Sequence, residues 1–272
     1  MVDSVVVVAG LVALVVEVDS PVAVEDHHGD DSNGDVMAMT LDELVSQLKA
    51  AYGPTLQSVI LYGSTVAGEH IAKKSDYNVL VILDAVPLDR LAAVGAVLRS
   101  WGEAGNPPPM TFTASEWKSS SDVFPMEYAD ILERHRVLYG VDATEGITVA
   151  RSDLRLQVEQ QALGKLLHLR RGAMAAGDDS KEQIALLEAS LSALMVVFRG
   201  VTRLAGDVPS QDYSALSADV AQRAGFDPAP FQHVIEHVRG TKKVSREEAS
   251  AVLAGYMAGM EALVAWLDRY SA

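Results

Sequence analysis

Hydrophobic and polar positions follow two different patterns along the chain, and the change falls near residue 150. In the first pattern, short apolar runs that are typical of strands alternate with segments of helical spacing. The apolar runs predict strands at residues 56–62, 78–83 and 110–114. Spacings of three and four predict helices at residues 41–52, 88–101 and 124–137. Thr40 and Glu43 have the form of a capping box that opens the first of these helices.

From Arg151 onward the pattern is helical alone. It predicts helices at residues 151–176, 212–224 and 228–239, with further apolar stripes along residues 184–201 and 252–267. We therefore expect an α/β (α+β) fold: a small mixed sheet with flanking helices at residues 37–148, followed by an all-α helical bundle domain at residues 149–272.

The first 36 residues differ from the rest, since they hold eight acidic residues and no Lys or Arg. The apolar run at residues 5–16 is too short to cross a bilayer, and no basic residue precedes it as in a secretory signal. His27 and His28 stand in an acidic stretch typical of a flexible linker. We interpret residues 1–36 as a disordered or non-native leader, expect the functional chain to begin at Met37 or Met39, and expect no membrane partner.

Overall charge and cysteine content restrict the function classes. The net charge of −15 argues against broad nucleic-acid binding, which depends on Lys and Arg at phosphates. The absence of cysteine excludes disulfides and thiolate metal sites. It is compatible with a reducing cytosol, and we expect a cytoplasmic protein. The acidic balance would suit a cationic acceptor such as an aminoglycoside, although net charge is poor evidence for a substrate.

Candidate chemistry gathers where the first predicted strand ends and the second begins. Gly63-Ser64 follows the strand at 56–62, and Asp76 and Asn78 open the strand at 78–83. Positions 76 and 78 share one face of a strand because side chains alternate with period two. Such a pair can hold a metal ion beside a phosphate bound at the Gly-Ser turn. A Gly-Ser turn alone is weak evidence, since many strand–turn–helix connections carry one.

The Gly-Ser turn with Asp-x-Asn 12 residues later resembles the core motif of polymerase-beta-type nucleotidyltransferases. The resemblance implies that Gly63 and Ser64 bind a triphosphate, and that Asp76 and Asn78 are the catalytic and metal positions for Mg²⁺. Asn78 departs from the family's second Asp and is a weaker Mg²⁺ ligand because it is uncharged. The family's third acid should lie on the strand at 110–114, which offers only Thr111 and Thr113.

Further segments resemble uncharacterised bacterial nucleotidyltransferase-domain proteins with a C-terminal helical bundle. These segments are residues 122–142, with Phe-Pro-x-Glu and Leu-Tyr-Gly-x-Asp, and the helix opening at residues 154–160. In such proteins Asn is usual at the second acidic position. By analogy with two-domain antibiotic nucleotidyltransferases, Lys165 and Arg170 are candidates for binding the triphosphate, with ordinary solvated charge as the alternative.

Other ionisable residues have competing interpretations. Glu116 or Glu127 could serve as a remote base, while Glu127 and Asp130 could instead pair with Arg134 on a helix surface. His135 could act as an acid or base, or belong to a solvated charged face. A pair spaced by four residues on a predicted helix, His233 and His237, could bind a metal, although no third ligand is evident.

Two hypotheses for the function stay open. In the first, the protein is a Mg²⁺-dependent nucleotidyltransferase that moves a nucleoside monophosphate from a nucleoside triphosphate to a hydroxyl of a small molecule or protein, with a partly degraded metal site. In the second, the fold is catalytically inactive and acts as a nucleotide-binding or protein-interaction module. The alternative from another fold class is a plain α/β regulatory domain with a helical dimerisation bundle. We also expect that the protein could form a homodimer.

Overall fold

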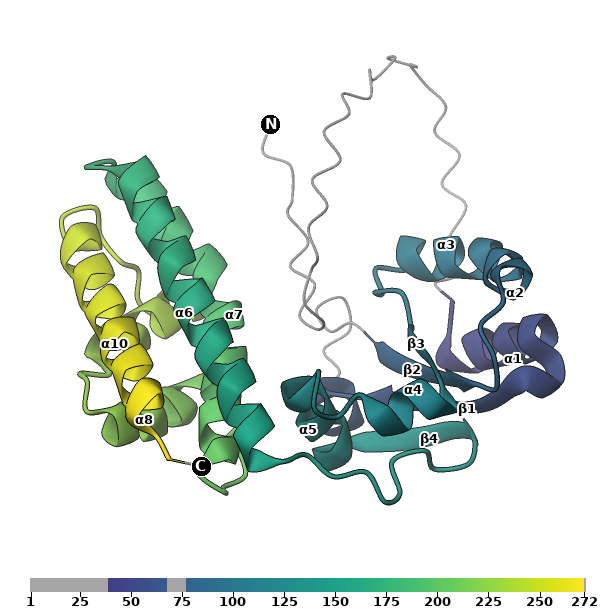
Figure 1. Cartoon of the computed structure of the whole chain (residues 1–272). Helices are drawn as coiled ribbons and strands as arrows, with labels where there is room; N and C mark the ends of the chain where they lie inside the picture. The colour runs from purple at the N-terminus through teal and green to yellow at the C-terminus, as the bar shows by residue number, and fades with distance from the viewer. Residues whose placement is uncertain (1–38, 68–76, 272) are drawn as a thin grey trace, which may run out of the picture. The chain divides into compact units, whose positions relative to one another are not determined.

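The computed structural model describes residues 39–67 and 77–271, which divide into two compact units. The α/β unit contains the described residues up to 119 and residues 130–146. The helical unit contains residues 120–129 and 147–271. Figure 1 shows the sheet of the first unit and the long helices of the second. The domain boundary near residue 148 stays a prediction. The division into two compact units assigns residues 120–129 to the helical unit.

The α/β unit is built from four strands and short helices. Its strands are β1 (Leu56–Tyr62), β2 (Asn78–Leu83), β3 (Met110–Thr113) and β4 (His135–Gly140). Its helices are α1 (Leu41–Tyr52), α2 (Leu88–Ala93), α3 (Gly95–Glu103), α4 (Ala114–Ser119), and the short 3-10 helices η1 (Gly53–Thr55) and η2 (Ser64–Ala67). The helix α5 (Pro125–Glu133) begins in the helical unit and ends in the α/β unit. The capping box of Thr40 and Glu43 at the start of α1 is confirmed.

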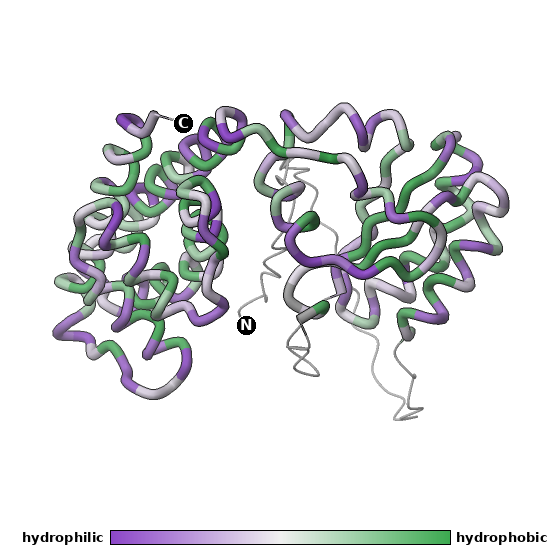
Figure 2. Tube along the Cα trace, turned by 90° about the horizontal axis from the view of Figure 1, so that it is seen from below, coloured by the Kyte–Doolittle hydropathy of each residue, from purple (hydrophilic) through white to green (hydrophobic). Residues whose placement is uncertain are grey.

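The sheet is mixed, with the strand order β3-β2-β1-β4. β1 pairs antiparallel with both β2 and β4, and β2 pairs parallel with β3. The two central strands are almost fully buried, as the continuous apolar run of β2 predicted. Figure 2 shows their hydrophobic character at the centre of the unit. The expected mixed sheet with flanking helices followed by a helical region is therefore confirmed.

The sheet has two differently covered faces. Residues at odd positions of β1 and β2, such as Val59 and Val81, pack with α1 and α3 around the buried Trp101. Residues at even positions belong to the other face, which carries Phe112 in contact with the buried Trp117 of α4. Asn78 lies on this second face because it is two residues from Leu80, which pairs with Met110 beside Phe112.

Two predicted helices differ from the structure. The segment 88–101 forms two helices, α2 and α3, because the backbone turns at Val94 (φ −88°, ψ −2°). The segment 124–137 was expected to be a single helix, and this is wrong, because α5 ends at Glu133 and β4 begins at His135. β4 instead extends the sheet by pairing with β1.

The helical unit contains five helices besides the start of α5: α6 (Arg151–Ala176), α7 (Ser180–Leu204), α8 (Tyr213–Ala224), α9 (Ala229–Arg239) and α10 (Ala249–Arg269). Its core is one hydrophobic cluster with contributions from all of them, in which the ring of Phe231 stacks on Tyr256 and makes a tilted contact with Phe198. Figure 1 shows α6 beside α10, in agreement with their contacts.

Two described helices, α7 and α10, are long and apolar enough to cross a membrane. Composition alone gives this result, and the core helix of a water-exposed protein passes the same test. Many of their large apolar residues, among them Leu194, Phe198 and Leu263, are fully buried in the hydrophobic cluster of the helical unit, although Val196 is 37% exposed. We therefore interpret α7 and α10 as core helices of the helical unit.

Candidate functional site

Gly63 forms a tight turn directly after β1. Its φ of +84° lies in the left-handed region that favours glycine. Its N–H donates to the carbonyl of Arg134 (3.2 Å), and its carbonyl accepts from Val66 N–H (3.2 Å). A Cβ atom at this position would lie 3.4 Å from Nδ2 of Asn78. The turn thus brings Gly63 and Asn78 together, and the Gly63 N–H is already used within the fold.

Thr65 follows in η2 and carries a buried hydroxyl. The residue is 9% exposed, and its Oγ1 has no hydrogen-bond partner among the described residues. An unpaired buried polar atom costs free energy unless a ligand or water satisfies it. The turn therefore offers the Thr65 hydroxyl, near the end of the sheet where Asn78 lies, as a hydrogen-bonding group for a phosphate oxygen.

Asn78 is the first residue of β2 and is half-buried. It pairs across the sheet with Tyr62, which in turn pairs with His135 on β4. These three residues form one row on the same face, with about 4.8 Å between neighbouring strands. Tyr77 anchors the entry to this strand, since its N–H donates to Asn106 Oδ1 (3.0 Å) and its ring stacks on Trp101.

Asp76, the predicted charged ligand, lies outside the described residues. Ser64 opens η2 in the structure. Among the predicted site residues, the structure therefore brings Gly63 and Asn78 together and leaves the position of Asp76 beside them as a prediction from strand periodicity.

The described part of β3 supplies no third acid to the face that carries Asn78. Thr111 pairs with Val81 and Thr113 with Leu83, so both lie on the opposite face, toward α1 and α3. Met110 and Phe112 occupy the face of Asn78. Nor do three His, Cys, Asp or Glu side chains come together anywhere among the described residues in a group that could hold a metal ion. These residues therefore do not form a Mg²⁺ site by themselves, because Asn78 supplies one uncharged oxygen.

Both carboxylates considered as remote bases accept hydrogen bonds from other residues of the fold. Glu116 accepts from the N–H of Thr113 (2.7 Å), and the Thr113 hydroxyl accepts from the N–H of Glu116, so the pair caps α4. This backbone hydrogen bond lowers the pKa of Glu116. Glu127 accepts from Nε2 of the buried Gln157 (2.8 Å). Each carboxylate therefore has a structural role.

His135 belongs to a hydrogen-bonded cluster that the sequence did not reveal. Its Nδ1 lies 2.9 Å from the carbonyl of Ile131, and its Nε2 lies 3.3 Å from Asp142 Oδ2 and 3.1 Å from the hydroxyl of the buried Thr144. The Thr144 hydroxyl donates to Asp142 Oδ1 (2.6 Å) and is the main reason that the pKa of Asp142 is lowered. The closing Gly-x-Asp at residues 140–142 was the only sequence signal of this cluster.

His233 and His237 do not form a metal pair in the structure. His237 is buried, accepts from the N–H of Val244 at Nδ1 (2.9 Å), and lies 2.6 Å from Glu188 through Nε2. Both of its nitrogens are therefore used within the helical unit, and among the described residues no third ligand accompanies the pair.

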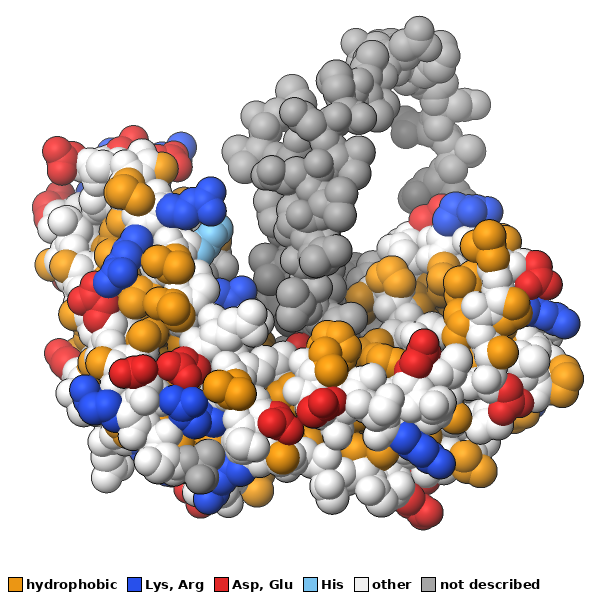
Figure 3. Space-filling model, viewed as in Figure 1, with side chains coloured by type: hydrophobic (Ala, Val, Ile, Leu, Met, Phe, Trp, Pro, Cys, Tyr) orange, Lys and Arg blue, Asp and Glu red, His pale blue; other side chains and the backbone are white. Residues whose placement is uncertain are grey.

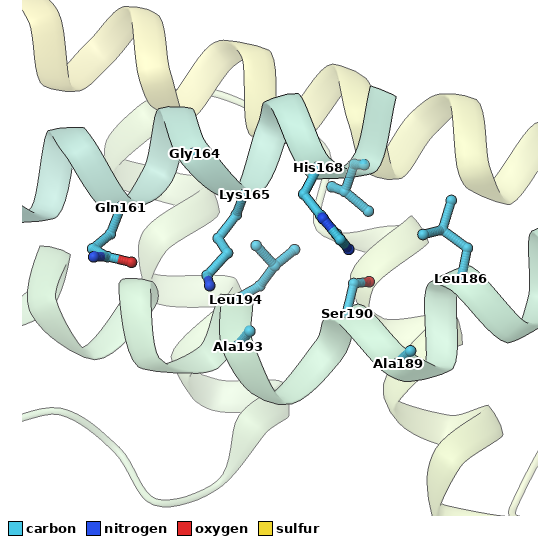
Figure 4. Close-up of a pocket in the computed structure, with 10 residues that line it drawn as sticks. Gln161, Gly164, Lys165, His168, Leu186, Ala189, Ser190, Ala193 and Leu194 are labelled. Carbon is cyan, nitrogen blue, oxygen red and sulfur yellow. The ribbon is translucent and has the colours of Figure 1, made fainter. Parts of the chain in front are cut away.

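The helical unit contains a pocket of ≈ 370 Å³ between α6 and α7. Gln161, Lys165 and His168 reach it from α6, and the small side chains of Ala189 and Ala193 on α7 leave room for it (Figure 4). No carboxylate is among its lining residues, and Lys165 forms no ion pair with any residue that the structure describes. Arg170, the other predicted phosphate ligand, pairs instead with Glu261 (2.8 Å).

Comparisons with known proteins give one informative result. No family model matches the chain, and no curated protein matches its sequence. Among solved structures, the chain is similar to spectinomycin adenyltransferase from Enterococcus faecialis, solved with ATP and spectinomycin. The TM-score is 0.52 at 10% sequence identity, over 81% of this chain and 97% of that chain.

The likeness shows a nucleotidyltransferase-like fold. At this identity it carries no information on substrate or activity by itself. It covers 81% of this chain, so it extends over residues of both the α/β unit and the helical unit.

Proposed function

We propose that the protein is a nucleotidyltransferase that transfers a nucleoside monophosphate from a nucleoside triphosphate to a hydroxyl of a small molecule or protein. The observation that carries this proposal is the turn at Gly63, which lies against Asn78 and is followed by Thr65, whose hydroxyl has no hydrogen-bond partner among the described residues. It lies in a fold similar to that of an enzyme solved with ATP and an acceptor. The turn has a left-handed glycine and a buried hydroxyl that no described residue pairs with, and both features suit the close approach of a phosphate.

In this proposal the triphosphate binds at the turn through Ser64 and Thr65, while Gly63 allows the backbone conformation. Asp76 and Asn78 would hold Mg²⁺, which when bound stabilises the charge that builds up on the phosphate oxygens. The described residues alone do not complete a Mg²⁺ site. The role that we derive for them is therefore to bind and orient the triphosphate. The dependence on Mg²⁺ stays a prediction.

Lys165 is the better supported of the two basic candidates for binding the triphosphate. It lines a pocket without a neutralising carboxylate, whereas Arg170 is paired with Glu261. A pocket lined by Lys165 and His168 also offers no negative charge to a polycationic acceptor such as an aminoglycoside. We therefore propose a neutral or anionic acceptor. We also propose a cytoplasmic location, with which the absence of cysteine is compatible.

The alternative function, an inactive fold that binds a nucleotide or a partner protein, also has an observation in its favour. On the described part of the sheet, Met110 and Phe112 stand on the face where the family's third acid is expected. Without that acid, no described side chain on β3 can act as base for the acceptor hydroxyl.

Replacing Asn78 by Asp separates the two functions. If the site is active but weakened, the Asn78→Asp change adds a charged metal ligand, and Mg²⁺-dependent release of pyrophosphate should rise by about tenfold or more. Asn78→Ala is the matched control and should lower the rate, because it removes the oxygen. A variant Asn78→Asp that binds nucleotide as the parent protein does but releases no pyrophosphate would favour the inactive module.

A further inference from the structure

Four large hydrophobic side chains lie exposed on one side of α6. We call them the α6 stripe, which consists of Leu156 (59% exposed), Leu163 (43%), Leu167 (49%) and Met174 (75%). At 3.6 residues per turn the four positions fall within roughly 40° of arc. Figure 3 shows hydrophobic side chains gathered over α6 on the face turned to the viewer. The helical unit therefore leaves an apolar strip uncovered along its first long helix.

The spacing of the stripe is that of a coiled-coil seam. Together with Gln160 and Arg170, its positions follow one another at alternating intervals of four and three residues from 156 to 174. This interval pattern is the heptad repeat that keeps one seam facing a partner helix. A polar residue within such a seam fixes the register of pairing, and Gln160 and Arg170 are suited to that role.

The seam is symmetric about position 165. Leu163 and Leu167 lie equally far on either side of it, as do Leu156 and Met174. When two copies of α6 run antiparallel around a two-fold axis at this position, Leu163 meets the partner's Leu167. In the same way Leu156 meets the partner's Met174, and Gln160 meets the partner's Arg170. Every apolar residue of the stripe thus faces another apolar residue, as a two-fold interface requires.

Charges beside the seam agree with the same pairing. Glu159, which pairs with Arg155 in the single chain (3.1 Å), flanks the seam on the side of Arg170 and would lie next to the partner's Arg170. Within the described part of a single chain, Arg170 forms an ion pair with Glu261 in which both side chains are about half exposed (44% and 50%). An exposed ion pair of this kind contributes little, so Arg170 can change partner at low cost.

We propose that the α6 stripe is the interface of a homodimer in which α6 packs antiparallel against α6 of a second copy. The self-complementary order of its apolar and polar positions favours a second copy over an unrelated partner. Lys165, although at the centre by sequence, reaches the pocket toward α7 and does not enter the seam. The pocket therefore stays open in the dimer.

Disulfide trapping tests the pairing directly, because the chain contains no cysteine of its own. Leu163→Cys and Leu167→Cys are made as separate full-length proteins and oxidised mildly, alone and mixed. The antiparallel seam places each new thiol opposite the other variant's thiol, so the mixture should form a covalent dimer and neither protein alone should do so. Cross-linking of Leu163→Cys with itself would show a parallel arrangement and overturn the proposal.

Sedimentation over a range of concentrations gives a second test. The parent protein should change from monomer to dimer, and the double change Leu163→Glu with Leu167→Glu should keep it monomeric. Val238→Glu, at a residue of α9 that is 51% exposed, is the matched control and should leave the dimer intact. A parent protein that is monomeric throughout overturns the proposal. If the parent protein is monomeric and the double variant unfolds at a lower temperature than the Val238→Glu control, a segment of the same chain, not a second copy, covers the stripe.

Discussion

Gly63 and Asn78 show what a local motif can predict. The Gly-Ser turn and the period-two placement at the head of β2 were readable from the sequence, because they depend on neighbours within a few residues. The sequence did not predict that the Gly63 N–H donates to Arg134, since this bond exists only because β4 pairs with β1. The Thr65 hydroxyl, which is buried without a hydrogen-bond partner among the described residues, likewise depends on tertiary packing.

The cluster of His135, Asp142 and Thr144 gives a prediction for pH dependence. The pKa of Asp142 lies below its ordinary value, mainly through the Thr144 hydroxyl. A carboxylate with a lowered folded-state pKa stabilises the fold above its unfolded pKa, and that contribution is lost as pH falls through the folded pKa. The change Thr144→Val should therefore raise the pKa of Asp142 toward its ordinary value.

Carboxyl ¹³C chemical shifts measured between pH 2 and neutrality, which span the ordinary Asp range of about 4, would give the pKa of Asp142 in each variant. Thr241→Val is the matched control, because the Thr241 hydroxyl donates to the backbone carbonyl of Glu236 and to no described carboxylate. An unchanged pKa in Thr144→Val would show that the hydroxyl does not hold the carboxylate in its charged form.

At the scale of elements, the long helices and the buried strands were predictable, and β4 was not. The residues from 124 to 137 keep a helical spacing of apolar positions, so periodicity alone gave one helix. In the structure α5 ends at Glu133, and the following residues gain more by pairing with the free edge of β1. An edge strand with half-exposed residues has a weak sequence signal, because its alternation is set by its neighbour.

Gly140 at the end of β4 shows how close that pairing is. A Cβ atom at Gly140 would lie 1.8 Å from the carbonyl oxygen of Gln57, and φ is +80°. Gly140→Ala should destabilise the α/β unit by about 2–5 kcal/mol, from the left-handed backbone together with the steric clash. Gly105→Ala is the matched control, since Gly105 has a similar φ of +86° but open space around it.

Urea unfolding of the two glycine variants would measure this difference. The control should lose only about 1–2 kcal/mol, the cost of the left-handed conformation. Equal losses in Gly140→Ala and Gly105→Ala would contradict the close approach of β4 to β1.

Gln157 joins the start of α5 to α6 within the helical unit. Its side-chain oxygen accepts from the N–H of Met126 (2.7 Å), and the residue is 7% exposed. Gln157→Leu should lower the free energy of unfolding by about 1–3 kcal/mol, because the buried N–H loses its acceptor. Gln161→Leu, one turn along α6 with a partly exposed side chain, should cost much less. Thermal unfolding of both variants followed by circular dichroism would check this.

For the whole molecule, the change of periodicity near residue 150 predicted an α/β part and a helical part, and the structure contains both. The boundary between the two units that falls within α5 had no such signal in the sequence, because it arises from the packing of Met126 of α5 into the core of the helical unit. The likeness to an adenyltransferase at 10% identity fits this outcome, since a packing pattern survives extensive replacement of residues. A substrate depends on a few side chains and could not be predicted in the same way.

The central claim, a nucleoside triphosphate bound at the Gly63 turn, is tested most directly by isothermal titration calorimetry of the full chain. ATP, GTP, CTP and UTP are titrated in the presence of Mg²⁺, and Gly63→Ala is titrated beside the parent protein. We predict saturable binding of at least one nucleotide at one site per chain, clearly weakened in a folded Gly63→Ala variant. The absence of binding heat for all four nucleotides, or equal binding by the two proteins, would contradict the account.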